Sequence, residues 1–266
     1  SLSADNSSRN TSFIKDLKDW SRIAKHIFIW DYAENWRGFM TPYPNINALG
    51  PNIQTFMKYK VMGVFEGGQN LSHGSDFEEL KSWLIGKLLW NPYQNTEFLA
   101  RQFIKDYYGS SSQEILQYYN LYNSLVKPDV HIGCRLKNES EFYNDDFVKK
   151  AYPIMERAEK AASDSVILER VKKVKLQVLA SEYALHPQSF YESGKWSEFK
   201  TLVLKYNAYI KLGVGPEKFI PEFESVVKKE KWHMKESNIA PLALLFSVGA
   251  LITTGIGLKR RNKKTA

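Results

Sequence analysis

The sequence is poor in residues that form covalent or metal cross-links. Its 266 residues include one cysteine, Cys134, so the chain cannot form an intramolecular disulfide. No cluster of His, Cys, Asp or Glu has metal-ligand spacing, and we find no glycine-rich phosphate loop and no serine nucleophile elbow. The sequence therefore offers no basis for a metal site or a cofactor, and we expect neither.

Negative charge is absent from the last eight residues, and this accounts for most of the basic character of the chain. The net charge is +8, and residues 259–266 carry five Lys or Arg side chains. The body of the chain is therefore close to neutral, at about +3. This balance argues against nucleic-acid binding, which calls for a basic surface on the folded domain.

One long run lacks charged residues altogether. Residues 239–258 contain 20 uncharged residues, close to what one helix needs to cross ~30 Å of hydrocarbon. The basic residues that follow predict a tail that stays in the cytoplasm. We therefore predict a single-pass helix in the cell membrane at 239–258, with the large N-terminal portion extracellular. The alternative is a buried core helix.

Hydrophobic residues make up 43% of the chain, enough for a packed core. Residues 1–92 alternate helical and strand-like patterns, with strand-like runs at 25–30 and 59–68. This order is typical of βα units with a parallel sheet. Two local signals refine the helices: Pro51 fits the first turn of one, and SDFE at 75–78 has the capping-box pattern.

Residues 93–230 show helical periods and no convincing strands. Thr96–Tyr108 reads as a helix that ends at Gly109, a favoured residue just beyond a helix C-terminus. We predict an α-helical bundle domain here, with a boundary near residues 88–95. Its role is open between support for the first domain and dimerisation.

Two acidic residues follow the predicted strands. Asp31 stands at the end of HIFIW, and Glu66 stands at the end of VMGVF. Ligands of parallel βα folds bind at the carboxyl ends of strands, so both acids are expected at one rim. Two carboxyls at one rim suit glycoside hydrolysis, where one protonates the leaving oxygen and the other attacks the anomeric carbon or activates water.

Aromatic side chains surround the first of these acids and could stack on the apolar faces of a sugar ring. The predicted substrate-binding residues are Trp30, Tyr32, Glu34, Trp36 and Tyr43. Each site residue also has a plainer interpretation. Asp31 would hold backbone N–H groups, Glu66 would pair with a nearby Lys, Glu34 would be an ordinary loop acid, and the loop aromatics would hold the loop down.

The motifs WDYAENW, TPYPNINALGPNIQTF, GVFEGG, LKSWLIGKLLWNPYQN and FIKDYYG resemble successive landmarks of the DUF4838 family. The likeness covers roughly residues 12–125. It implies a glycoside-hydrolase-like TIM (β/α)₈ barrel in bacterial proteins. On this resemblance residues 1–92 would be the last βα units of the barrel, and the helical domain would follow it.

A full barrel takes ~200 residues or more, so we expect most of it to be missing from this chain. We accordingly expect a surface-anchored, glycan-active parent protein, acting on a polysaccharide or glycoconjugate, and no activity from the 266-residue chain alone. Two rival functions stay open. One is a non-catalytic carbohydrate-binding surface protein, and the other is a structural adhesin or spacer with protein partners.

Overall fold

The computed structural model of the chain describes residues 8–68, 73–126, 143–209 and 214–229. Most of these residues are helical, and two short strands lie near the N-terminus. The elements are, in order, α1 (Ser8–Ile23), β1 (Phe28–Tyr32), α2 (Ile46–Lys58), β2 (Gly63–Gly67), α3 (Glu78–Trp90), α4 (Thr96–Tyr108), a 3₁₀ turn (Gly109–Ser111), α5 (Ser112–Asn123), α6 (Asp145–Ala161), α7 (Ser165–Leu185), α8 (Pro187–Glu192), α9 (Lys195–Lys205) and α10 (Pro216–Lys229).

The two strands form a parallel sheet, with α2 as the connection between them. Their register pairs Phe28 with Gly63 at one end and Tyr32 with Gly67 at the other. One more hydrogen bond, from the Ala33 N–H to the Gly67 carbonyl at 3.0 Å, extends the pairing by a residue. The parallel β-α-β arrangement expected from the alternating pattern is therefore present.

The predicted TIM barrel is not present in the described fold. The part of the chain that the structure describes contains two strands in one two-stranded sheet, so the prediction that residues 1–92 form the last units of a TIM barrel is wrong for this fold. Periodicity correctly identified a parallel pair of strands. Periodicity carries no information on whether a sheet closes into a barrel, because closure depends on partner strands at both edges of the sheet.

The predicted membrane helix is likewise not part of the described fold. Residues 239–258 and the basic tail at 259–266 lie outside the described residues. Among the helices that the structure does describe, none is both long enough and apolar enough to cross a membrane. The location in a cell membrane stays a prediction from the sequence.

Several helix ends follow their local signals. α4 ends at Gly109, whose φ of +46° lies in the left-handed region that favours glycine. The Asp164 carboxylate accepts hydrogen bonds of 2.9 Å from the N–H groups of Val166 and Ile167 and so caps α7. Asn95 caps α4 in the same way.

Two local predictions were wrong in detail. Pro51 lies in the sixth position of α2 rather than its first turn, because this helix begins at Ile46. The capping box at 75–78 is half formed: the Glu78 carboxylate accepts from the Gly74 and Ser75 N–H groups, but the Ser75 hydroxyl makes no cap.

Helix α7 lies between two buried apolar clusters. The first joins α2 to α7 and crosses the predicted boundary near residue 92, since it includes Leu84 and Leu88 of α3 together with Ile104 of α4. The second joins α7 to α8, α9 and α10, and it also contains Met40 from the loop after β1. That loop is thus packed against the helical region.

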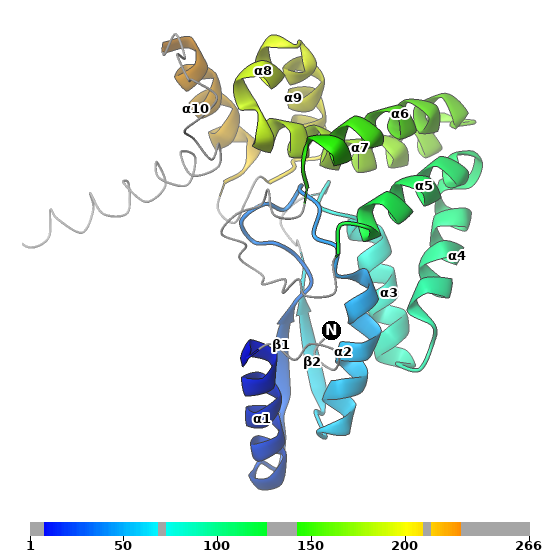
Figure 1. The fold of residues 1–266 in the computed structure, drawn as a ribbon, viewed down its shortest axis with the longest axis vertical. Helices are drawn as coiled ribbons and strands as arrows, with labels where there is room; N and C mark the ends of the chain where they lie inside the picture. The colour runs from blue at the N-terminus through cyan, green and yellow to red at the C-terminus, as the bar shows by residue number, and fades with distance from the viewer. Residues whose placement is uncertain (1–7, 69–72, 127–142, 210–213, 230–266) are drawn as a thin grey trace, which may run out of the picture.

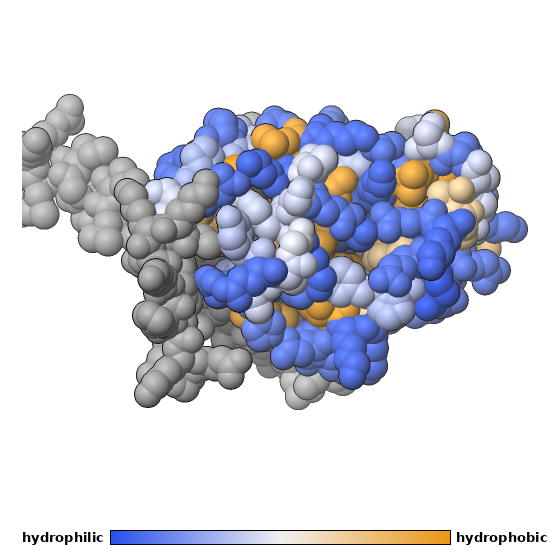
Figure 2. Space-filling view, turned by 90° about the horizontal axis from the view of Figure 1, so that it is seen from above, coloured by the Kyte–Doolittle hydropathy of each residue, from blue (hydrophilic) through white to orange (hydrophobic). Residues whose placement is uncertain are grey.

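Figure 1 shows the resulting arrangement: the strands and α1 occupy one end of an elongated molecule, and α6 to α10 occupy the other. β1 runs toward the helical end and leads into the loop at the middle of the molecule. The carboxyl ends of both parallel strands therefore point toward the helices. Seen from the helical end, the surface is mostly hydrophilic with small, separate hydrophobic areas (Figure 2).

Candidate functional site

Asp31 and Glu66 lie side by side in the parallel sheet. They are register partners on β1 and β2, so their side chains project from the same face, with backbones about 4.8 Å apart. Both residues lie within their strands rather than just beyond them. Asp31 also accepts a 2.8 Å hydrogen bond from the N–H of Tyr32. The structure thus brings together the two acids that the sequence singled out.

The two carboxyls compete for protons. Burial, and next the negative charge of Asp31, raise the pKa of Glu66 to about 7. Burial also raises the pKa of Asp31, against the lowering effect of the Tyr32 N–H. Within the described residues, neither carboxyl has a basic side chain paired with it. The proton of Glu66 is therefore exchanged in the neutral range of pH.

The aromatic residues of the strands lie on the opposite face of the sheet. Side chains alternate along a strand, so Trp30 projects away from Asp31. Its ring contacts Phe65 edge-on, with centroids 4.7 Å apart, and 66% of Trp30 is exposed. Gly67 lies under the Trp30 and Tyr32 rings, where a Cβ would come within 3.4 Å of both. Trp30 is therefore an exposed aromatic surface, but not one beside the acids.

A chain of ring contacts continues from this face into the loop after β1. Trp30 lies 6.3 Å from Tyr32, Tyr32 lies 5.3 Å from Trp36, and Trp36 lies 5.7 Å from the buried Phe39. Tyr32 and Trp36 are half-buried. The rings of these two predicted stacking residues are in edge-on contact with each other. Together they connect the exposed Trp30 on the sheet to the buried Phe39 in the loop.

Glu34 and Tyr43 lie in the interior. Glu34 is 2% exposed, and one of its oxygens lies 3.7 Å from the ammonium of Lys81. Tyr43 packs in the first apolar cluster, and its backbone carbonyl accepts a hydrogen bond from Lys81. Neither residue presents a surface on which a sugar could stack. The burial of Tyr43 fits its plainer interpretation, in which it holds the loop down, whereas Glu34 is not an ordinary exposed loop acid.

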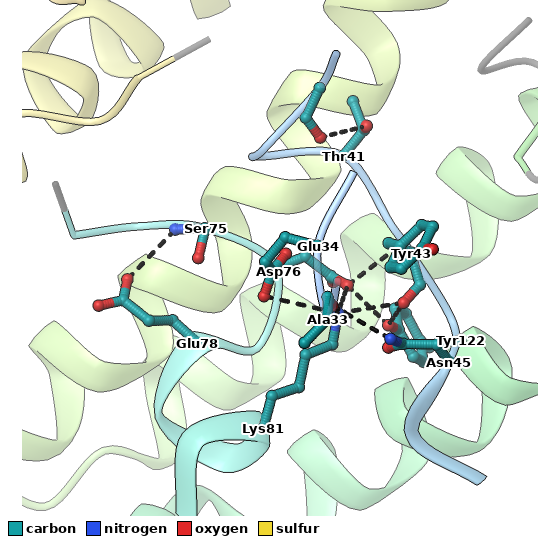
Figure 3. Close-up of polar contacts among 11 residues, drawn as sticks. Ala33, Glu34, Thr41, Tyr43, Asn45, Ser75, Asp76, Glu78, Lys81 and Tyr122 are labelled. Atoms are coloured by element: carbon teal, nitrogen blue, oxygen red, sulfur yellow. Dashed lines mark hydrogen bonds and ion pairs between the residues drawn. The ribbon is translucent and has the colours of Figure 1, made fainter. Parts of the chain in front are cut away.

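Lys81 is the centre of a buried polar cluster (Figure 3). Its ammonium donates to the Asp76 carboxylate at 2.7 Å and to the carbonyls of Tyr43 at 3.1 Å and Ala33 at 3.4 Å. The Tyr122 hydroxyl from α5 lies 2.7 Å from the same Asp76 oxygen and 2.6 Å from the Tyr43 carbonyl. The cluster thus ties the loop after β1 to α3 and α5.

The charge of this cluster is balanced by a proton on Glu34. Burial raises the pKa of Glu34 to about 8, opposed by Lys81 and reinforced by the negative charges of Asp76 and Glu78. The other Glu34 oxygen has no hydrogen-bond partner within the described residues. One ammonium therefore faces one carboxylate and one carboxylic acid at neutral pH.

Sequence reasoning missed Lys81, Asp76 and Tyr122. Asp76 was read as part of a helix start. One signal was available: Lys81 lies four residues after Phe77 and three before Leu84, on the apolar face of α3. A lysine in that position requires a buried acid as a partner. Among the described residues, no group of three or more His, Cys, Asp or Glu could hold a metal ion.

Comparison with family models gives a match near the N-terminus. Residues 3–120 match the model described as "Domain of unknown function (DUF4838)". Over these residues the chain is similar to the DUF4838 family. The resemblance expected from the sequence motifs is thereby confirmed, and the DUF4838 segment covers both strands, the loop after β1 and helices up to α5. No curated protein and no solved structure matches the chain significantly.

Proposed function

We propose that this protein acts on glycans and hydrolyses an O-glycosidic bond of a polysaccharide or glycoconjugate. The observation that supports this most is the pair formed by Asp31 and Glu66 on adjacent parallel strands. The pKa of Glu66 is raised to about 7, so this carboxyl keeps a share of its proton near neutral pH, and the Asp31 carboxyl lies beside it. Glycoside hydrolysis needs a carboxylic acid and a carboxylate held close together.

The roles follow from the pKa values. Glu66, with its pKa raised to about 7, donates its proton to the glycosidic oxygen as the bond to the anomeric carbon breaks. Asp31 supplies the carboxylate, which either attacks the anomeric carbon or takes a proton from the attacking water. If Asp31 attacks, water then hydrolyses the glycosyl–Asp31 ester and gives a proton to Glu66; if Asp31 takes the proton of the attacking water, it releases that proton to solvent and Glu66 regains one from solvent.

The test compares wild type with Asp31→Asn and Glu66→Gln in the full natural polypeptide that carries these residues. Turnover of a panel of aryl glycosides and polysaccharides is measured together with binding to the same glycans. We expect each substitution to abolish turnover while binding is retained. Asp106→Asn, an exposed carboxyl-to-amide change in α4, is the matched control and should leave turnover unchanged.

If neither wild type nor the control turns over any glycan that it binds, the hydrolase assignment fails. Turnover that survives both Asp31→Asn and Glu66→Gln would instead place the chemistry elsewhere.

A second candidate function is glycan binding without catalysis. The observation that favours it is the exposed ring pair of Trp30 and Phe65 on the face opposite the acids. Flat aromatic surfaces of this kind stack on sugar rings, and glycans bound there would not touch Asp31 or Glu66. Trp30→Ala should then weaken glycan binding strongly, whereas the Asp31→Asn and Glu66→Gln variants bind as wild type and no variant shows turnover.

A further inference from the structure

The loop between β1 and α2 is unusual because it is buried. Residues 38–44 are all buried, and the Phe39 and Met40 side chains pack inside the molecule. Loops normally run over the surface, since their backbone polar groups otherwise lose contact with water. This loop must therefore find partners for its carbonyl and N–H groups inside the protein.

Lys81 satisfies carbonyls at both ends of this loop. Its ammonium donates to Ala33, the first residue after β1, and to Tyr43, ten residues later. A single side chain from α3 thus fixes the distance between the two ends of the loop. The ring of Tyr43 also lies 5.2 Å from the same ammonium, which adds a cation–π contact.

Asp76 completes the attachment. Its carboxylate accepts from the Tyr43 N–H at 2.9 Å and from the Lys81 ammonium, and its own N–H donates to the Phe39 carbonyl at 2.9 Å. The Tyr122 hydroxyl joins the cluster from α5. The loop that starts directly beyond Asp31 and Tyr32 is therefore held by α3 and α5.

We propose that Lys81 is a positioning residue for the candidate site: through the Ala33 and Tyr43 carbonyls it holds the β1 loop, which starts directly beyond Asp31 and Tyr32, in the arrangement that meets the glycan. The role in glycan recognition rests on the proposed function. The attachment of the loop by Lys81 is independent of it and can be measured without any glycan.

The attachment is sensitive to pH through Glu34. The groups that face Glu34 are Lys81, Asp76 and Glu78 of α3 and the segment before it, and Tyr122 of α5. When Glu34 loses its proton, two carboxylates share one ammonium in a buried site, so Lys81 is drawn away from the loop carbonyls. We therefore expect the loop to loosen as the pH rises through about 8.

Hydrogen exchange at the backbone amides of residues 33–43, in the full chain, tests the attachment. We expect Lys81→Met to speed exchange in this segment by about tenfold or more, with α6 and α7 unchanged. Lys173→Met is the matched control, because Lys173 also ties α3 to another helix through Glu79 but does not touch the loop. Unchanged exchange in Lys81→Met would overturn the proposal.

Two further variants keep the test decisive if Lys81→Met does not fold. Tyr122→Phe removes only the hydroxyl that bridges Asp76 and Tyr43, and should speed exchange in the same segment by a smaller factor. Glu34→Gln keeps a neutral side chain of the same shape, so exchange, corrected for its intrinsic pH dependence, should no longer accelerate near pH 8. An equal acceleration in wild type and Glu34→Gln would contradict the role of this cluster.

Glycan binding then separates this proposal from the proposed function. If Lys81→Met loosens the loop and weakens glycan binding while Lys173→Met does neither, both proposals are supported. If the loop loosens but wild type binds no glycan, the proposed function fails and the attachment by Lys81 stands. If the loop loosens and binding is unaffected, Lys81 holds the loop but does not position the site.

Discussion

Asp31 and Glu66 form one pair of neighbouring acidic residues, and Glu34 and Asp76 form another. The two pairs differ in whether a basic side chain lies between their carboxyls. Asp31 and Glu66 stand on adjacent strands with no basic partner among the described residues, whereas Glu34 and Asp76 share the ammonium of Lys81. In both pairs burial raises the pKa of the glutamate, to about 7 in the first and about 8 in the second.

The difference separates a pair suited to chemistry from a pair suited to structure. Without a cation, the proton of the strand pair can leave Glu66 within the neutral range, and both carboxyls are only partly buried. In the second pair the Lys81 ammonium and the Asp76 carboxylate hold groups of the loop in the interior, and the Glu34 carboxyl lies 3.7 Å from that ammonium. A raised pKa alone therefore does not mark a catalytic residue; its partners and exposure decide.

The largest expected difference between the pairs is in stability. Asp76→Asn leaves the Lys81 ammonium in the interior without its 2.7 Å partner, so we expect the free energy of unfolding to fall by about 3–5 kcal/mol. Asp31→Asn relieves repulsion with Glu66, so the loss should be less than about 1 kcal/mol. Urea unfolding of both variants measures this difference, and similar losses would show that the two pairs are equivalent.

A smaller effect is expected in the pH dependence of stability. The folded protein holds the Glu34 proton more tightly than the unfolded chain, whose pKa is near 4.5. The stability that this proton provides is therefore full below pH 4.5 and is lost as the pH rises toward about 8. Glu34→Gln should flatten the decline in unfolding free energy over this range.

Glu66 gives a decline of the same sign, over the narrower range from about 4.5 to about 7. Between about pH 7 and 8 Glu66 no longer contributes, so the decline that remains there in the wild type should disappear in Glu34→Gln. An unchanged pH profile in Glu34→Gln would mean that this carboxyl is not the one that titrates. Urea unfolding at half-unit steps of pH provides the measurement.

The smallest expected effect is local to the strand pair. Asp31→Asn removes the negative charge that contributes to the raised pKa of Glu66, so that pKa should fall below 7 while the burial contribution remains. The titration of the Glu66 side-chain carboxyl carbon by NMR reports this directly. Asp76→Asn should leave the same titration where it is, and a shift there would mean that the two pairs are coupled.

The helices were predictable because their signals are local. Residues 96–108 carry the apolar spacing of a helix and are followed by Gly109, and α4 has these bounds. The ends of the strands were less predictable than those of the helices, because pairing across the sheet sets where each strand ends. The predicted strand stopped before Asp31, but β1 continues to Tyr32 since Glu66 and Gly67 of β2 pair with it.

That shift of two residues changed the predicted site. With Asp31 beyond the strand, Trp30 and Tyr32 were expected around it. With Asp31 inside the strand, alternation places Trp30 on the other face. Glu34 and Tyr43 could not be placed from sequence, because their surroundings come from α3 and α5, which are far away along the chain. The barrel was an inference from family resemblance, and the described fold does not contain it.

The buried loop also bears on how this protein folds. The Tyr122 hydroxyl and the Tyr43 carbonyl are 79 positions apart in the sequence, and Lys81 and Ala33 are 48 apart. Closing such long segments costs chain entropy before any contact is made, so contacts of this range tend to form late. The loop can dock only after α3 and α5 have met. Substitutions in the Lys81 cluster should then speed unfolding far more than they slow folding, and the cluster would set the lifetime of the native state.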